Sequence, residues 1–160
     1  MKIGLISDTH GHLDPQISAL FAGVEHILHA GDIGSESLLD ALRAIAPVTA
    51  VLGNTDNSLR DHGFRNVERC KLGGRTFLLI HTGRPHGLSD DMRRMIFDED
   101  KPDVVVFGHT HQPERIVENG VTFINPGSAS RPRMRQHPTV AIVEIHADGR
   151  IEVRWLTLDA

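Results

Sequence analysis

The chain has no tyrosine, one tryptophan, one cysteine and no long apolar run. Because Cys70 stands alone, the chain can form no internal disulfide, and a zinc site closed by several thiolates is excluded. A lone cysteine fits a reducing compartment, so we expect a cytoplasmic location. No apolar run approaches the roughly 20 residues that span a bilayer, and the charged Lys2 comes too early for a signal-peptide core. We therefore expect neither membrane insertion nor a signal peptide.

A basic excess is also lacking. The chain has 17 Lys and Arg against 21 Asp and Glu, a net charge of −4. No broad positive field is present to hold nucleic acid nonspecifically. The length of 160 residues suits one core, and no linker or internal repeat interrupts it. We predict a single domain over residues 1–160.

The first third of the chain alternates short apolar strands with amphipathic helices. One helix is expected at 16–21, and a second lies between an N-cap at Ser35 and the stop at Pro47. The strands are expected at 2–7, 26–29 and 48–52. This βαβαβ pattern indicates parallel strands with right-handed crossovers, and such sheets bind ligands outside the carboxyl ends of their strands.

Beyond residue 65, turn signals mark antiparallel hairpins. A helix at 89–97 and a buried strand at 103–107 lie between the first two of them. The hairpins pair 67–72 with 75–80 through Gly73-Gly74, 114–118 with 121–124 through Asn119-Gly120, and 140–146 with 151–158 through Asp148-Gly149. Hairpins added to parallel units predict an α/β fold, a four-layer α/β/β/α sandwich of two mixed β-sheets flanked by helices.

Most informative are the polar residues that follow the apolar strands. Several of the 11 histidines lie there, together with Asp and Asn side chains. These strand-end motifs are Asp8-Thr9-His10, Gly31-Asp32, Gly53-Asn54, His81 and Gly108-His109-Thr110-His111. Oxygen and imidazole donors together suit first-row divalent metals better than calcium. The recurrence of such motifs at strand ends favours a metal site.

Each motif taken alone has an ordinary structural explanation. Asp32 could cap the helix that follows, Asn54 could belong to a turn, and His81 could be a buried histidine bonded to backbone. Asp8 and His10 are two residues apart, so in extended backbone their side chains would leave the same face. Glycine before Asp32 or Asn54 would let the backbone bend tightly.

The order Asp-x-His, Gly-Asp, Gly-Asn, His, Gly-His-x-His resembles the calcineurin-like metallophosphoesterase superfamily. Asn125-Pro126-Gly127-Ser128 also resembles its small single-domain phosphodiesterases, which are related to the retromer scaffold subunit. The resemblance implies that two divalent metal ions are bound, with manganese expected and iron, nickel, zinc or magnesium open. One ion would be held by Asp8, His10 and His111 and the other by Asn54, His81 and His109, with Asp32 bridging them. Among these residues, the implied catalytic ones are Asp8, Asp32, Asn54 and His109.

The activity implied is that of a dinuclear metal-dependent phosphoesterase, in which a metal-bridging hydroxide attacks phosphorus in line. The superfamily usually has histidine after Gly-Asn, whereas this chain has Thr55, which cannot act as a general acid near pH 7. A phosphodiesterase acting on diesters with acidic leaving groups is therefore favoured, and Asp56 is expected to orient a metal ligand.

Two other functions are weighed against this one. The first is a non-catalytic protein-interaction scaffold on the same fold. The second is a mononuclear amide hydrolase, for which the His-Glu-x-x-His signature is absent. The partner expected is a small phosphoester, with a nucleotide-like one open, and no membrane.

Several residues near the proposed site stay ambiguous. His86 is an alternative to His81 as ligand, and His12 could donate a proton, although a solvated loop histidine is favoured. Arg131, Arg133 and Arg135 could contact phosphate or form a solvated loop. A homodimer through Trp155 and Leu158 is open, since these residues could equally cover a sheet edge.

Overall fold

The computed structural model describes residues 1–159 and contains two five-stranded mixed sheets. The first sheet has the order β10-β9-β1-β2-β3. In it β2 runs parallel to β1 and β3, and β9 runs antiparallel to β1 and β10. Its strands are β1 (Lys2–Ile6), β2 (His26–His29), β3 (Val48–Ala50), β9 (Thr139–Ile145) and β10 (Ile151–Thr157).

The second sheet has the order β4-β5-β6-β8-β7. Here β6 runs parallel to β5 and β8, while the edge strands β4 and β7 are antiparallel to their neighbours. Its strands are β4 (Val67–Leu72), β5 (Arg75–Ile80), β6 (Val104–Val106), β7 (Pro113–Glu118) and β8 (Val121–Pro126).

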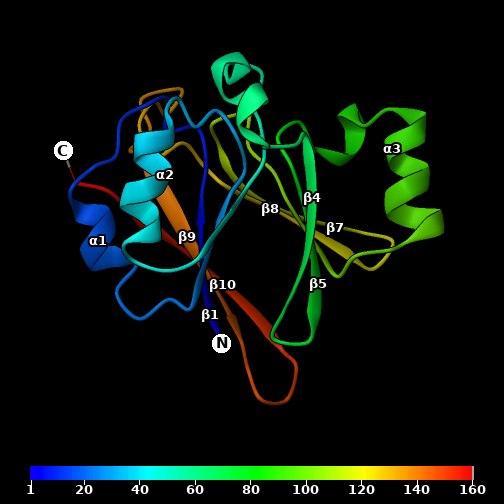
Figure 1. Cartoon of the computed structure of the whole chain (residues 1–160). Helices are drawn as coiled ribbons and strands as arrows, with labels where there is room; N and C mark the ends of the chain where they lie inside the picture. Colours follow the sequence, from blue (N-terminus) through cyan, green and yellow to red (C-terminus); the bar gives the residue numbers. More distant parts are fainter. Residues whose placement is uncertain (160) are drawn as a thin grey trace.

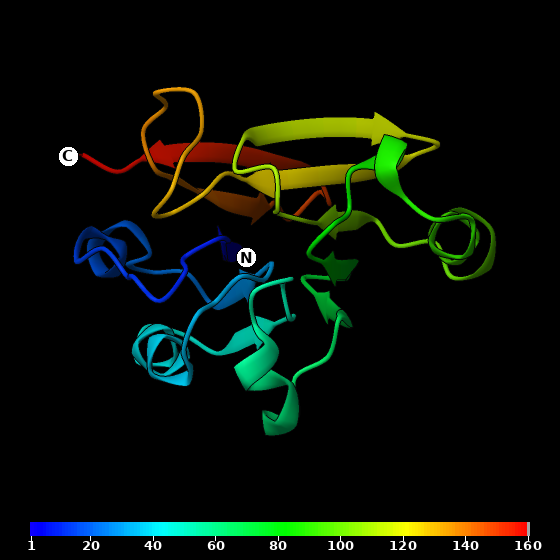
Figure 2. The ribbon, with the colours of Figure 1, turned by 90° about the horizontal axis from the view of Figure 1, so that it is seen from above.

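Helices cover the outer faces of both sheets. Helices α1 and α2 lie on one side of the strands and α3 lies on the opposite side (Figures 1 and 2). Helix α2 begins after Ser35, whose hydroxyl accepts the Leu38 N–H at 3.4 Å, as the predicted N-cap requires. The helical segments are α1 (Gln16–Leu20), α2 (Glu36–Arg43), α3 (Asp90–Arg94), the 3₁₀ helices η1 (Asn57–His62) and η2 (Pro85–Gly87), and the π-helix η3 (Met95–Glu99).

Three apolar clusters separate four layers. Ile17 of α1 and Leu39 of α2 pack with Ile27 on the outer face of the first sheet. The inner faces of the two sheets meet around a second cluster, and Ile96 of η3 packs with Phe123 on the outer face of the second sheet. The predicted fold of two mixed sheets flanked by helices is confirmed.

Some local predictions were wrong. The helix predicted over 89–97 changes at Met95 from α to π geometry. Strand β3 ends at Ala50, because Val51 forms only an isolated bridge to Arg65. Leu158, considered for a contact surface, is fully buried against the helices of the first sheet. In the part of the chain described here, no helix is both long and apolar enough to cross a membrane.

Candidate metal centre

The predicted ligands all lie in loops that follow parallel strands. Asp8 and His10 follow β1, and the loops after β2, β3, β5 and β6 carry the others. The first three of these strands belong to one sheet and the last two to the other. The loops therefore meet where the carboxyl ends of both sheets adjoin, the position expected for a ligand site in this class of fold.

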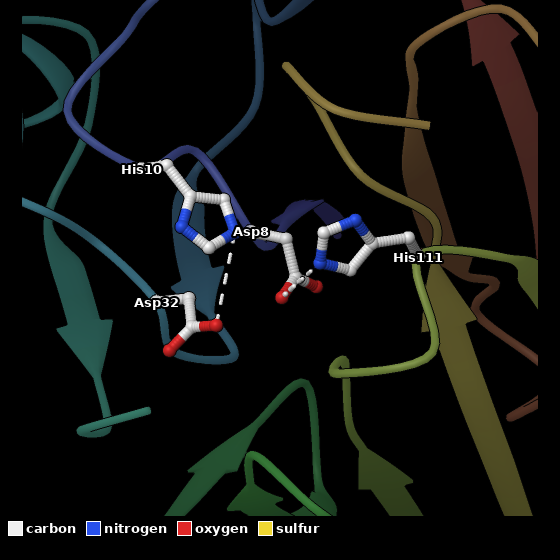
Figure 3. Close-up of side chains that lie close together, drawn as sticks. All are labelled: Asp8, His10, Asp32 and His111. Carbon is white, nitrogen blue, oxygen red and sulfur yellow. Dashed lines mark ion pairs between the residues drawn. The ribbon is translucent and has the colours of Figure 1, made fainter. Parts of the chain in front are cut away.

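One group of donors consists of Asp8, His10, Asp32 and His111. One donor atom from each lies within 4.8 Å of all the others. His10 Nε2 is 3.7 Å from Asp32 Oδ2, and His111 Nε2 is 3.3 Å from Asp8 Oδ1. Figure 3 shows the four side chains pointing toward one another, Asp8 and His10 from one loop and Asp32 and His111 from two others. This group contains the predicted ligands of the first ion and the predicted bridge.

A second group is centred on Asn54. Its Oδ1 lies 3.0 Å from His81 Nε2 and 3.2 Å from His109 Nδ1. The Oδ2 atom of Asp32 is 3.4 Å from His81 Nε2 as well as 3.7 Å from His10 Nε2. The Asp32 carboxylate thus lies between the two groups, where a bridging ligand would have to be.

The ligand loops have left-handed backbone, which we had not predicted. The φ angles are 53°, 47°, 53°, 69° and 62° at Asp8, His10, Asp32, His109 and His111 respectively. The expected extended geometry of Asp8 and His10 was therefore wrong. Left-handed backbone costs roughly 1–2 kcal/mol for each residue with a side chain. Pairing between loops holds it here, with the N–H groups of Asp8 and His10 donating to the carbonyls of Gly31 and Asp32.

The same geometry explains how two histidines in one loop reach different groups. In a regular strand His109 and His111 would point to the same face. Left-handed backbone at both positions instead directs His109 toward Asn54 and His111 toward Asp8.

Glycine at two of these loops is required by close approach. A Cβ at position 53 would lie 2.1 Å from Asp32 Oδ1, and one at position 108 would lie 2.0 Å from the Ser7 hydroxyl. Gly53 was expected to provide a tight bend, but its φ is not positive, and the structure shows that it provides room for Asp32.

The ring nitrogens of His81 reveal an unusual environment. Nδ1 lies 2.7 Å from the Ala30 carbonyl and must donate to it, which leaves a lone pair on Nε2 of the neutral ring. Nε2 faces oxygen atoms of Asn54, Asp32 and Asp8 at 3.0, 3.4 and 3.8 Å. Burial opposes a charge on this ring, but the hydrogen bond to Asp32 and the charge of Asp8 raise the His81 pKa. The pocket thus favours a positive charge at Nε2.

The two carboxylates each have one oxygen held by the protein. Asp8 Oδ2 accepts hydrogen bonds from the Ser7 hydroxyl at 2.8 Å and the His109 N–H at 3.1 Å, and Asp32 Oδ1 accepts from the Thr55 N–H at 3.0 Å. Burial raises the pKa of Asp8. At Asp32 burial acts in the same direction, but hydrogen bonds from His81 and Thr55 hold its pKa well below its usual range.

Two buried atoms of this site that could bind a metal lack a hydrogen-bond partner. Among residues 1–159, Asp8 Oδ1 and His10 Nε2 make no hydrogen bond although both are shielded from solvent. Buried polar atoms are nearly always bonded, so such atoms at one site suit an ion that both would bind. A divalent cation fits this donor set of carboxylates, an amide oxygen and imidazoles.

Asp56 holds two of the ligand loops together. Its fully buried carboxylate accepts the N–H groups of Ile33 and Gly53 at Oδ2 and of Gly34 at Oδ1, at 2.8–3.0 Å. Ile33 and Gly34 follow Asp32, and Gly53 precedes Asn54. The supporting role expected for Asp56 agrees with these contacts.

The Asn-Pro-Gly-Ser motif supports the loops after β1 and β6, a role that we did not predict from the sequence. The Asn125 amide donates to the Gly108 carbonyl at 3.1 Å and to Thr110 Oγ1 at 2.9 Å. The Ser128 hydroxyl donates to the Asp8 carbonyl at 2.9 Å. Asn125 is the penultimate residue of β8, so its place near a strand end was the available signal.

Other candidates lie at the rim of the site or away from it. His86 is exposed in η2, so His81 is the histidine of this pair that joins the cluster. His12 is also exposed. Arg131 has an exposed side chain, but its carbonyl accepts a hydrogen bond from His111 Nδ1.

Burial lowers the pKa of the proposed ligand His10, and the positive charge of Arg131 adds to that effect.

Comparison with known proteins identifies the family. The sequence profile of the calcineurin-like phosphoesterase superfamily domain matches residues 1–148. The chain belongs to the calcineurin-like phosphoesterase superfamily. A protein from Methanothermobacter thermautotrophicus named "Probable metallophosphoesterase" is 34% identical over 92% of this chain and 88% of its own length.

Two solved structures share the fold. An archaeal phosphodiesterase has a TM-score of 0.74 at 26% identity, covering 98% of this chain and 100% of its own. A Vps29 variant from Entamoeba histolytica has a TM-score of 0.74 at 23% identity, covering 99% and 100%. The second likeness concerns the fold alone. Superfamily membership supports a metal-binding hydrolase that acts on phosphoester bonds.

Proposed function

We propose that this calcineurin-like protein is a dinuclear metal-dependent phosphodiesterase. The observation that carries the proposal is the convergence of oxygen atoms and lone pairs around Asp8 Oδ1 and His81 Nε2. Two divalent ions held between these atoms would offset the charge of the carboxylates and bind the lone pairs of the imidazoles. The first ion is assigned to Asp8, His10 and His111, the second to Asn54, His81 and His109, and Asp32 is assigned to both.

Manganese is our proposed metal, with iron, nickel, zinc and magnesium as alternatives, because mixed oxygen and nitrogen ligands admit all of them. When bound, two such ions supply a nucleophilic water at neutral pH and offset the negative charge of the phosphoryl group.

The protein's own part is to hold its donors in place before substrate arrives. The Ser7 hydroxyl and the His109 N–H fix one oxygen of Asp8, so the other faces the site. The Thr55 N–H does the same for Asp32. His81 Nδ1 donates to the Ala30 carbonyl, and His111 Nδ1 donates to the Arg131 carbonyl. In each ring Nε2 therefore keeps its lone pair and can bind a metal ion.

Preference for diesters is proposed from Thr55. A threonine hydroxyl cannot protonate a leaving oxygen near pH 7, so substrates whose leaving groups depart unprotonated are favoured. The likeness to an archaeal phosphodiesterase supports the same choice.

The test combines metal analysis with a substrate panel. Purified protein loaded with manganese should hold two ions per chain and hydrolyse bis(p-nitrophenyl) phosphate faster than p-nitrophenyl phosphate. Replacing residues that only orient metal ligands typically lowers metal affinity or activity 10–100-fold. Asp32→Asn changes a proposed ligand itself, so its rate of diester hydrolysis should fall by more than about 100-fold. Asp98→Asn, which alters an exposed carboxylate on the π-helix η3, is the matched control.

Other outcomes would point to different functions. Unchanged diester hydrolysis by Asp32→Asn would refute the assignment. One ion per chain would favour a mononuclear enzyme. Protein that binds no metal and hydrolyses neither substrate would favour an interaction scaffold on this fold.

A further inference from the structure

A pocket of about 230 Å³ adjoins the proposed metal centre at Asn54 and His81. Its wall also includes Arg60, Asn66 and Thr82. Sites that enclose a whole ligand typically measure about 300–1,000 Å³. This smaller pocket therefore suits one arm of a substrate whose phosphate lies at the metal centre.

The segment between β3 and β4 forms one side of this pocket, and its backbone is held in place by core packing and a hydrogen bond. Leu59, in η1, is only 4% exposed and packs into the core beneath the helices. The Leu52 N–H donates to the Arg65 carbonyl at 2.8 Å, which returns the chain toward the end of β3. Arg60 and Asn66 are thus exposed side chains on a backbone that the core and this hydrogen bond position.

The wall of the pocket carries the positive charge of Arg60. Within residues 1–159, none of the side chains that line it is a carboxylate, while Asn66 and Thr82 add an amide and a hydroxyl as hydrogen-bond donors. Among residues 1–159, Arg60 is not one of the arginines that form ion pairs. By contrast, Arg84, two residues after Thr82, is paired with Glu114 at 2.9 Å. A guanidinium with no carboxylate partner can bind a phosphate or carboxylate through two parallel hydrogen bonds.

We infer that the Arg60 pocket binds a permanently anionic group, a phosphate or a carboxylate, on the ester arm that hydrolysis leaves attached to phosphorus. This inference rests on the proposed function and names its substrate class: phosphodiesters with a second anion on one arm. Because that charge is the same before and after hydrolysis, the contact strengthens substrate binding and is expected mainly in KM.

The kinetic test uses three diesters that share a p-nitrophenyl leaving group. Their retained arms are butyl, 3-carboxypropyl and 3-phosphopropyl. A hydrogen bond to a charged group predicts a KM about 10- to 100-fold lower for an anionic arm than for butyl. A lower KM for both anionic diesters than for the butyl diester supports binding of either anion. A lower KM for only one of them identifies the anion that the pocket selects.

Variants assign the effect to Arg60. In Arg60→Ala the KM ratio of butyl to anionic diester should fall to about one, and Arg60→Lys, which keeps the charge without the planar fork, should give an intermediate ratio. Arg65→Ala removes an exposed arginine of the same segment that does not border the pocket, and it should keep the wild-type ratio. A ratio near one in the wild type, or a ratio unchanged in Arg60→Ala, overturns the inference.

A binding measurement separates this inference from the proposed function. Calorimetry of the manganese-loaded protein with non-hydrolysable propane-1,3-diphosphonate should show at least about tenfold weaker binding to Arg60→Ala than to Arg65→Ala. Such a difference in binding, without hydrolysis of any diester, would refute the proposed phosphodiesterase function but support the anion pocket. Hydrolysis of the butyl diester with equal diphosphonate binding by both variants would refute the pocket alone.

Discussion

The buried His29 makes a measurable prediction about acid stability. Its ring is fully buried, and Nδ1 accepts the Gly31 N–H at 3.2 Å. Nε2 therefore carries the proton and donates to Thr9 Oγ1 at 2.9 Å. The Thr9 hydroxyl in turn donates a hydrogen bond to the Ile33 carbonyl. Protonated Nδ1 would face the Gly31 N–H donor. Burial accordingly lowers the pKa of His29 to about 3.

The size of the effect follows from proton linkage. Unfolded His29 has a pKa near 6.5, so between about pH 6.5 and pH 3 the unfolded chain binds a proton that the folded protein does not. Stability is fully present above this window and falls as the pH falls through it. At pH 5 the loss from His29 is about 2 kcal/mol, which is about 1.5 pH units at 1.36 kcal/mol each.

Urea unfolding of metal-free protein, followed through the fluorescence of the single tryptophan, Trp155, measures this loss. The stability difference between pH 7.5 and pH 5 should be about 2 kcal/mol smaller in His29→Gln than in the wild type. His12→Gln, which removes an exposed imidazole, is the control. Equal pH dependence in His29→Gln and the wild type would refute the reasoning.

Two further predictions concern Gly53 and Cys70. A Cβ at position 53 would lie 2.1 Å from Asp32 Oδ1 and 2.2 Å from its backbone nitrogen, so Gly53→Ala should lose bound metal by elemental analysis. Gly87→Ala, whose Cβ would meet nothing within 4 Å, should retain it, and equal metal content in both variants would contradict this view of the loop. Burial raises the pKa of the Cys70 thiol to about 11, so iodoacetamide at pH 8 should alkylate it on the order of 100-fold more slowly than a free cysteine. Mass spectrometry measures the rate, and a rate equal to that in urea-unfolded protein would contradict the burial argument.

The sequence predicted local structure well where local chemistry decides it. The strands His26–His29, Val67–Leu72 and Arg75–Ile80 have the predicted bounds, because turn residues and apolar runs define them directly. The 3₁₀ helix Asn57–His62 was missed, since it lacks a periodic apolar face. Strand order was not predicted either, because the pairing of β9 with β1 joins residues more than 100 positions apart and depends on the whole core.

For the candidate site, which residues lie together was easier to predict than their backbone conformation. Asp8 and His10 were identified by their place after a strand, and the structure puts them beside the other proposed ligands. Their left-handed backbone could not be predicted, because Asp and His adopt it only in a minority of cases and hydrogen bonds to the loop after β2 hold it here. The roles of Asn125 and Ser128 likewise depend on contacts with loops distant in sequence.

The position of the ligand loops has a mechanical consequence. In both proposed ligand sets, residues after strands of the first sheet act together with residues after strands of the second: Asp8 and His10 with His111, and Asn54 with His81 and His109. Elsewhere the inner faces of the two sheets meet through apolar contacts, which have no preferred direction, and a hydrogen bond from Trp155 Nε1 to the Asn125 carbonyl also joins the sheets. Metal ions in these positions would be directional cross-links between the two halves of the sandwich, so the centre that binds substrate would also set the alignment of the sheets.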